Sequence, residues 1–328
     1  MRRDRESSKE KSISLQTRFG RNRFFSYFAG NYDMYLMLLL PAVFYVAFKY
    51  IPIYGLVLAF KDYNFQKGIL GSDWNGFAVF QDVFRDKMFW LSIRNTVGLN
   101  LLSLLIGFPI PIIFALLLNE LKFVRFKRVI QSISYLPHFV SWVIFYGIIL
   151  ALTAPNTGII NLILKNQGIS QVNFLTERGW WLTIYIVSSI WKETGWQAIL
   201  YLSALTGIDQ GLYEAAAIDG AGRFKSLWHI TLPGIRSTIV IILILEIGKI
   251  MTIGFEKPFL LGNSMVNDIS TVLSTYIYTM GITRAQYSMT TAVGLFQSVI
   301  NFTLVLGADK IAKLLGEQGL IAKKMKNS

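Results

Sequence analysis

Long apolar segments alternate with short polar ones along this chain. Six of the apolar segments are long enough to cross a membrane, which takes a helix of about 20 mostly apolar residues. These segments are Met34–Phe60, Asn95–Asn119, Val129–Leu152, Trp180–Leu205, Ile235–Leu261 and Ala285–Ala308. Because the backbone in lipid must satisfy its own hydrogen bonds, each segment is expected to be helical. The pattern predicts an all-α membrane protein with six transmembrane helices.

The composition agrees with this class of protein. Of the 328 residues, 53% are hydrophobic and only 16% are charged, against about 25% charged residues in soluble domains. The formal net charge of +13 would also suit a nucleic-acid-binding protein. We interpret it instead as the excess of Lys and Arg that membrane proteins carry on their cytoplasmic side. The chain has no cysteine, which excludes disulfides, zinc–thiolate sites and a thiol nucleophile.

The basic residues gather in the N-terminal tail, in the loop after the second segment and at the C-terminus. Since cytoplasmic regions carry this excess, both termini are predicted to be cytoplasmic. We expect a basic tail at 1–33, a transmembrane domain at 34–316 and a second basic tail at 317–328. Within the first tail, Ser12–Gly30 has the composition of an amphipathic helix on the membrane surface. A docking site for a partner is the alternative there.

The polar loop between the fourth and fifth segments then also lies in the cytoplasm. Leu212–Ile218 is rich in strong helix formers. Asp219 and Gly220 mark its end, because glycine readily takes the left-handed conformation that ends helices. Arg223–Ile230 can form a second short helix, and Pro233 suits the first turn of the next one. The sequence predicts a helix–turn–helix on the cytoplasmic face, with an ordinary interfacial loop as the alternative.

The same loop carries a long gapped motif. Its sequence, YEAAAIDGAGRFKSLWHITLPGI, matches the pattern EAA-x3-G-x9-I-x-LP at every position and resembles the EAA loop of ABC importer permeases. The resemblance implies that 209–232 couples this chain to an ATPase, with Glu214 engaging the ATPase and Gly220 permitting the turn. The residues assigned to coupling on this basis are Glu214, Ala215, Ala216, Asp219, Gly220, Arg223, Ile230, Leu232 and Pro233.

Three further segments are similar to the permeases of oligosaccharide importers in the maltose-transporter group, and most similar to the subgroup that handles polysaccharide fragments. They are YIPIYGLVLAFKDYN, SIRNTVGLNLL and FKRVIQSISYLPHFVSWVI. The resemblance implies a multi-pass subunit in the bacterial cytoplasmic (inner) membrane. Its implied partners are a second homologous permease in a heterodimer, two ATPase subunits, an extracytoplasmic sugar-binding protein and an oligosaccharide.

No cofactor is expected in this chain. A phosphate-binding G-x-x-x-x-G-K-[ST] loop is absent from the sequence. ATP and Mg would therefore be bound by the partner ATPase, and this chain is not expected to be an enzyme.

Polar and charged residues inside membrane helices are costly, which makes each of them a candidate for a substrate path. The fourth segment presents four such residues at helical spacing, and the fifth presents a stripe of three. A histidine follows a proline at the start of the third segment. The candidates are His138, Ser189, Glu193, Trp196, Gln197, Glu246, Lys249 and Ile253. The maltose-type resemblance implies that helices flanking the loop line the sugar path, near His138, Glu193, Trp196 and Lys249.

Two questions stay open from the sequence. Glu246 and Lys249 are also spaced to pair with each other on one helix. His138 and Lys249 would suit an acidic oligosaccharide, such as a pectin or alginate fragment. Glu193 and Glu246 argue instead for a neutral one.

No catalytic or metal-binding site is predicted. An intramembrane enzyme would need clustered acids, histidines or a nucleophile with its base. Of the two histidines, His138 lies near the start of the third segment and His229 lies in the loop between the fourth and fifth segments. Such an enzyme, a passive channel and a permease for another class of solute are the alternatives to an oligosaccharide permease.

Overall fold

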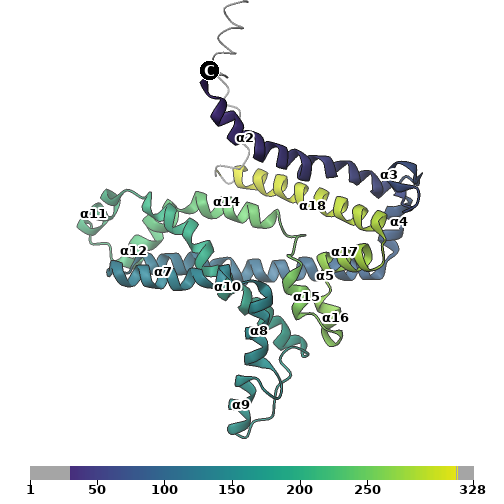
Figure 1. Ribbon diagram of the computed structural model, residues 1–328. Coiled ribbons are helices and arrows are strands. Elements are labelled where there is room, and N and C mark those ends of the chain that lie inside the picture. Colours follow the sequence, from purple (N-terminus) through teal and green to yellow (C-terminus); the bar gives the residue numbers. More distant parts are fainter. Residues whose placement is uncertain (1–29, 315, 317–328) are drawn as a thin grey trace, which may run out of the picture. The chain divides into compact units, whose positions relative to one another are not determined.

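The computed structural model describes residues 30–314 and 316, which are mostly helical (Figure 1). The expected surface helix at Ser12–Gly30, apart from Gly30 itself, and the basic tail at 317–328 lie outside these residues. The internal contacts divide the chain into two units, with the boundary between Val57 and Leu58. The first unit contains most of the first expected span, and the second contains the others.

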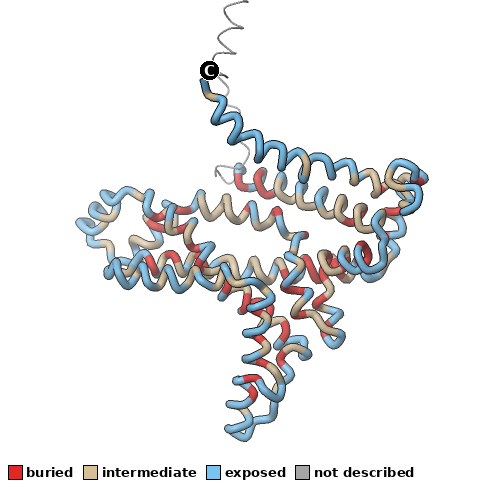
Figure 2. The backbone as a smooth tube through the Cα atoms, in the orientation of Figure 1, coloured by how far each residue is buried: buried red, intermediate tan, exposed pale blue. Residues whose placement is uncertain are grey.

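The first expected span is a continuous helical segment, Tyr32–Phe60, which is long and apolar enough to cross a membrane. It consists of the α-helix α2 (Tyr32–Tyr45), a π-helical turn η1 (Val46–Tyr50) and a 3-10 segment η2 (Ile51–Phe60). Pro52 has no N–H to donate to the preceding turn, which explains a change of helical geometry there. None of its most apolar window is buried (Figure 2), as expected for a helix surrounded by lipid.

The second and sixth expected spans are also helices of sufficient length and apolarity. Lys87–Asn119 runs over 33 residues and Tyr287–Leu314, α18, over 28. The first of these comprises α5 (Lys87–Leu102), a π-helical turn η3 (Ser103–Gly107) and α6 (Pro109–Asn119). Asp86 caps α5, since its Oδ1 accepts a hydrogen bond of 2.8 Å from the N–H of Met88.

The fourth expected span is α10, a helix of 29 residues from Arg178 to Thr206. It contacts α6, α7 and the later helix α14, so it forms the centre of the second unit. Trp181 is fully buried and donates a hydrogen bond of 2.9 Å from Nε1 to the carbonyl of Leu261. Although long enough, α10 does not reach the apolar composition of the three helices above.

The third expected span, Val129–Leu152, is not one straight helix. Two helices take its place, α7 (Val124–Phe139) and α8 (Trp142–Thr153). They meet at an angle of 102°. Pro137 removes one hydrogen bond from the last turn of α7, and Ser141 offers an N-cap to α8, because its Oγ accepts from the N–H of Ile144 at 3.4 Å. The expectation of a single helix was wrong at this point.

The fifth expected span, Ile235–Leu261, is broken as well. Its helical parts are α14 (Arg236–Ile247) and α15 (Glu256–Leu261). Residues 248–255 between them are not helical, and we call them the break. At its other end α14 is bent by 58° from the preceding helix, Arg223–Gly234. The described part of the chain thus holds three long apolar helices, or up to five candidate spans when each bent pair counts as one.

Short elements connect the long helices. The strands β1 (Lys61–Asp62) and β2 (Asp73–Trp74) pair antiparallel, with Lys61 opposite Trp74. The short helices are α3 (Gly68–Gly71), α4 (Ala78–Arg85), α9 (Ile159–Asn166), η5 (Ser264–Val266), α16 (Asn267–Ser270), α17 (Leu273–Tyr278) and η6 (Thr279–Thr283).

Two buried clusters hold several helices of the second unit together. One contains Phe89 of α5, Tyr276 of α17 and Val293 of α18. The other contains Phe145 of α8, Trp181 of α10 and Val272. These clusters fix α5, α10 and α15–α17 relative to one another, and the main cavity lies among these elements.

Candidate functional site

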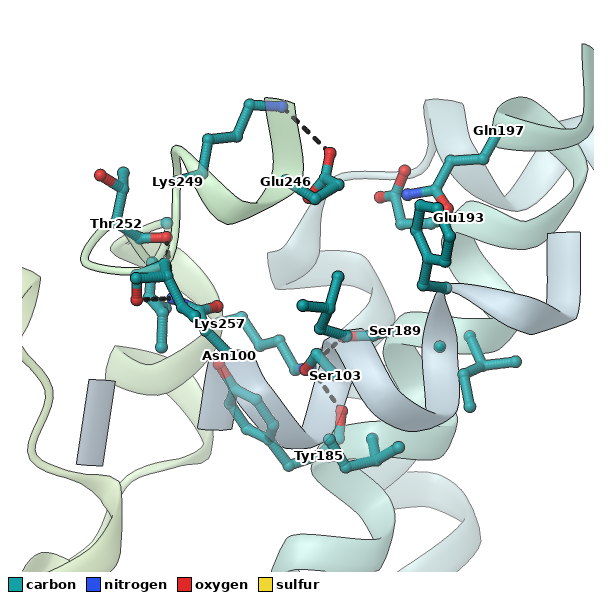
Figure 3. A pocket seen from close by; sticks show the side chains of 18 of the residues that line it. Asn100, Ser103, Tyr185, Ser189, Glu193, Gln197, Glu246, Lys249, Thr252 and Lys257 are labelled. Carbon is teal, nitrogen blue, oxygen red and sulfur yellow. Dashed lines mark hydrogen bonds and ion pairs between the residues drawn. The ribbon is translucent and has the colours of Figure 1, made fainter. Parts of the chain in front are cut away.

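One cavity, which we call the main cavity, has a volume of about 590 Å³ and is bounded by α5 and η3, by α10, and by α14 with the break and α15 (Figure 3). Its wall is rich in polar side chains. These are Asn100, Ser103, Ser189, Glu193, Thr194, Gln197, Glu246, Lys249, Thr252, Glu256 and Lys257. A polar cavity among otherwise apolar helices is the expected form of a solute path through a membrane protein.

On the α10 wall of the cavity, three of the four residues that the sequence predicted for this helix are present. Ser189, Glu193 and Gln197 all line the cavity. They are spaced four residues apart, which places them on one face of a helix. Six of the eight predicted path residues line the cavity: Ser189, Glu193, Gln197, Glu246, Lys249 and Ile253.

His138 and Trp196 do not line the cavity but lie against each other. Their rings stack with centroids 4.5 Å apart and an interplanar angle of 1°. His138 Nδ1 lies 2.8 Å from Oε2 of Glu193. The carboxylate of Glu193 therefore joins the cavity wall to this stacked pair.

Lys192 is buried at the joint between α7 and α10. Its Nζ donates hydrogen bonds to the carbonyl oxygens of Pro137, His138 and Val140, at 3.1, 2.6 and 2.5 Å. These carbonyls belong to the end of α7, where no further turn of helix can satisfy them. Lys192 therefore caps α7 and stabilises the bend, a role that the sequence did not indicate.

The α14 wall carries Glu246 and Lys249. Nζ of Lys249 lies 3.2 Å from Oε1 of Glu246, so the two form the ion pair that their spacing allows. Both side chains also line the cavity, and that of Lys249 is 63% exposed. The geometry thus shows the pairing that the spacing allows and also places both side chains on the cavity wall.

Lys257, on α15, was not among the site residues predicted from the sequence. It is only 6% exposed, and its Nζ donates to the carbonyl of Tyr185 and to the hydroxyl of Ser189, both on α10 (Figure 3). The ammonium also faces the rings of Tyr185 and Trp142, at 3.4 and 5.2 Å from their centroids. This contact fastens α15 to α10.

Three amide side chains support the break in the fifth span. Nδ2 of Asn100 donates to the carbonyls of Ile250 and Thr252 at 2.7 and 3.2 Å. From α18, Nε2 of Gln297 donates to the carbonyl of Met251 at 2.6 Å, and Asn301 accepts from the N–H of Met251 at 3.2 Å. The sequence signal for these residues was an amide inside an apolar segment, which is costly unless it has a partner.

A second cavity of about 500 Å³ lies beside the first. Pro258 and Phe259 of α15 line it, whereas Lys257 lines the first cavity, so the two cavities share α15 as a wall. Tyr276 donates a hydrogen bond of 2.6 Å to Oδ2 of Asp86 at its rim. Burial, and then this carboxylate, raise the pKa of Tyr276.

The predicted helix–turn–helix is present between α10 and α14. α11 (Gln210–Ile218) is capped by Asp209, whose Oδ1 accepts from the N–H of Gly211 at 2.9 Å. Gly220 has φ of +73°, the left-handed conformation expected of the turn. The second helix continues from α12 (Arg223–Ser226) through the π-helical turn η4 (Leu227–Thr231) into α13 (Leu232–Gly234).

The surface of this helix–turn–helix is exposed and carries both charge and apolar bulk. Glu214, Asp219 and Arg223 are exposed. Large apolar side chains surround them, namely Leu212, Ile218, Phe224 and Trp228, each at least 53% exposed. A hydrogen bond of 3.0 Å between Tyr213 Oη and Thr231 Oγ1 joins the two arms.

Among the described residues, no three acidic or histidine side chains gather closely enough to hold a metal ion.

The comparison with protein families places most of the chain in one family. Residues 89–315 match the family described as binding-protein-dependent transport system inner membrane component. The match begins within α5 and covers the cavity, the helix–turn–helix and α18.

Two curated relatives come from Bacillus subtilis (strain 168). Protein LplB is 46% identical over 287 residues, which cover 88% of this chain and 90% of that protein. The polygalacturonan/rhamnogalacturonan transport system permease protein YteP is 44% identical, over 88% of this chain and 89% of that protein.

Two solved structures have the same fold. One is a bacterial alginate ABC transporter in complex with alginate pentasaccharide-bound periplasmic protein. Its matching chain has a TM-score of 0.80 and 38% identity, over 89% of this chain and 98% of that one. The other is a bacterial ABC transporter involved in the import of the acidic polysaccharide alginate, with a TM-score of 0.81 and 38% identity, over 90% of this chain and 100% of that one.

Proposed function

Because the chain belongs to the family of binding-protein-dependent transport system inner membrane components, we propose that it forms half of a heterodimeric permease for acidic oligosaccharides. It is a permease of a carbohydrate ABC importer, as the family and the relatives establish. The single observation that supports the finer assignment is the polar cavity between α10 and the broken fifth span. That cavity would form this chain's side of the sugar path.

The proposal of an acidic sugar rests on the positive charges in the cavity wall and on the substrates for which the relatives are named. Lys249 and Lys257 both lie on the cavity wall. YteP is named for polygalacturonan and rhamnogalacturonan, and the solved neighbours are importers of alginate. A uronate oligosaccharide, which carries one carboxylate per uronate unit, is the substrate class that suits these observations best.

Coupling to ATP hydrolysis is assigned to 209–232. In this proposal Glu214 and the exposed apolar side chains around it contact an ATPase subunit, which binds ATP and Mg. An ion pair in a partly desolvated contact would give this docking its specificity. The chain itself would carry no catalytic activity.

The proposed topology has six membrane crossings within 34–316, with both termini in the cytoplasm. The bent pair α7–α8 would then form the third crossing, and α14 with α15 the fifth. The helix–turn–helix would lie in the cytoplasm and the second cavity would lie on the outer side. An extracytoplasmic binding protein would deliver the sugar there.

The proposal can be tested by purifying the tagged chain from its native membrane in mild detergent and identifying what comes with it by mass spectrometry. A second permease and an ATPase are expected, and the ATPase is expected to be lost on Glu214→Arg. Proteoliposomes of the intact complex should then import trigalacturonate with ATP and the binding protein. A chain that purifies without an ATPase, under conditions that preserve other complexes, would favour the enzyme or channel alternatives.

A further inference from the structure

The two lysines of the main cavity differ in how their charge is balanced. Lys249 forms an ion pair with Glu246 and its side chain is largely exposed. Lys257 is buried, and none of the carboxylates in the described residues forms an ion pair with it. Its ammonium is held by a carbonyl, a hydroxyl and two aromatic rings.

Such an arrangement leaves part of the ammonium unused. A lysine has three N–H donors, and two of those of Lys257 go to Tyr185 and Ser189. A buried charge is costly unless it is paired and fully hydrogen-bonded. Lys257 lines the cavity, so the remaining donor and the unbalanced charge are available to a group that enters it.

Three carboxylates line the main cavity, and none of them forms an ion pair with Lys257. Glu193, four residues from Ser189 on α10, contacts His138. Glu246 contacts Lys249. Glu256, the first residue of α15, is exposed and lies at the helix N-terminus, where a negative charge is favoured.

The aromatic neighbours suit a sugar. Trp142 and Tyr185 line the cavity beside Lys257. Aromatic rings pack against the apolar faces of sugars, and an ammonium next to such a ring can receive the carboxylate of the same unit. An uncharged sugar would leave the ammonium as it is, without a counter-charge.

From this we propose that Lys257 is the residue of this chain that selects acidic over neutral oligosaccharides, by donating its free N–H to a uronate carboxylate in the main cavity. The inference rests on the proposed function and names the group that would recognise its substrate class. Lys249, one of the two basic residues that the sequence offered for an acidic sugar, is already paired with Glu246.

The test uses the complete importer in proteoliposomes with its binding protein and ATP. The probes are trigalacturonate and the neutral galactotriose, and each variant's initial uptake rate is divided by the wild-type rate for the same sugar. This division removes the preference of the binding protein. ATP hydrolysis by the same vesicles reports assembly.

Lys257→Gln is expected to lower uptake of trigalacturonate about tenfold, the effect of losing one charge-assisted hydrogen bond. Uptake of galactotriose is expected to fall much less than uptake of trigalacturonate. Lys257→Arg keeps the charge and is expected to retain uptake of both sugars. The matched control is Lys165→Gln, which removes the same charge from an exposed position on α9.

A second variant leaves the lysine in place. Ser189→Asp puts a carboxylate where the hydroxyl accepts from Lys257, and so neutralises the ammonium within the wall. It is expected to reproduce the selective loss of trigalacturonate uptake, and it decides the question if Lys257→Gln does not assemble.

Two results would overturn the inference while the proposed function stands. One is wild-type uptake of trigalacturonate by Lys257→Gln. The other is an equal loss of both sugars in Lys257→Gln and Ser189→Asp, which would mark a purely structural role. A wild-type importer that moves galactotriose but no trigalacturonate would instead overturn the acidic substrate itself, and the inference with it.

Discussion

Lys192 donates a hydrogen bond of 2.6 Å to the carbonyl oxygen of His138, although the two residues lie on different helices. The bond forms where α7 ends and the chain turns by 102° into α8. An ammonium suits this place because it carries several donors, and the carbonyl oxygens at a helix end favour positive charge. The bend is therefore held by α10, the central helix of the unit.

Replacing Lys192 by methionine is expected to weaken this joint. The side chain keeps its approximate length, but the carbonyls of Pro137, His138 and Val140 lose their donor. Leaving buried acceptors unsatisfied costs about 1–3 kcal/mol. A lower thermal midpoint of the purified complex would show this, whereas Lys165→Met, at an exposed position, should leave the midpoint unchanged. An unaltered midpoint for Lys192→Met would mean that water replaces the ammonium.

Gly195 permits the close approach of α10 to α7. A Cβ atom at this position would lie 2.1 Å from the carbonyl oxygen of Ser134, a backbone atom that cannot turn aside. Gly195→Ala is expected to force the helices apart and to cost about 1–3 kcal/mol, the usual range for overpacking. The readout is the amount of assembled complex recovered at equal expression.

The control for this substitution is Gly147→Ala. Gly147 lies within α8, and a Cβ atom there would meet nothing within 4 Å. Alanine is the better helix former by about 1 kcal/mol, so this variant should assemble at least as well as the wild type. Equal recovery of both variants would contradict the role given to Gly195.

Asn100→Leu should destabilise the break in the fifth span. The substitution keeps the size of the side chain but removes the donor to the carbonyls of Ile250 and Thr252, with a cost of about 1–3 kcal/mol. We expect faster proteolysis of the purified complex within 248–255, located by mass spectrometry. Asn166→Leu, at the exposed end of α9, is the matched control and should not change the cleavage pattern.

Lys249→Gln should have a modest effect. The ion pair with Glu246 is partly exposed, and such pairs contribute about 0.2–1 kcal/mol. Uptake of trigalacturonate is expected to fall less in this variant than in Lys257→Gln. A larger fall in Lys249→Gln would assign the preference for acidic sugars to Lys249 instead of Lys257.

Glu214→Arg and Gly220→Val are expected to uncouple ATP hydrolysis from transport. The first reverses the charge of the exposed helix α11. The second places a β-branched residue at φ of +73°, where it is strained. Uptake and ATP hydrolysis are measured on the same vesicles at equal expression. Unchanged uptake in both variants would contradict the coupling role of 209–232.

The parts of the fold that could be predicted from sequence are those set by one local signal. The length of the apolar segments predicted the long helices. Gly220, with strong helix formers on the segment before it, predicted the helix–turn–helix. The motif in that loop, with three further segments, was enough to identify the family. The bend after Pro137 and the break at 248–255 were missed, because hydropathy averages over a window and does not register where a helix stops.

The site was predicted only as far as helical periodicity reaches. Ser189, Glu193 and Gln197 share a face by spacing alone. That Trp196 stacks on His138, and that Lys257 reaches across to α10, depends on how separate helices pack. No regular spacing links such residues along the chain, so the pattern of one segment contained no signal for them.

The short helix α15 is a partition with one face toward each cavity. Lys257 lines one cavity and Pro258 the other, so the volumes on its two sides are not independent. Any displacement of this partition that enlarges one compartment must reduce its neighbour. If α15 moved, the two cavities would therefore widen in alternation, and the position of this six-residue helix would set the volume of each.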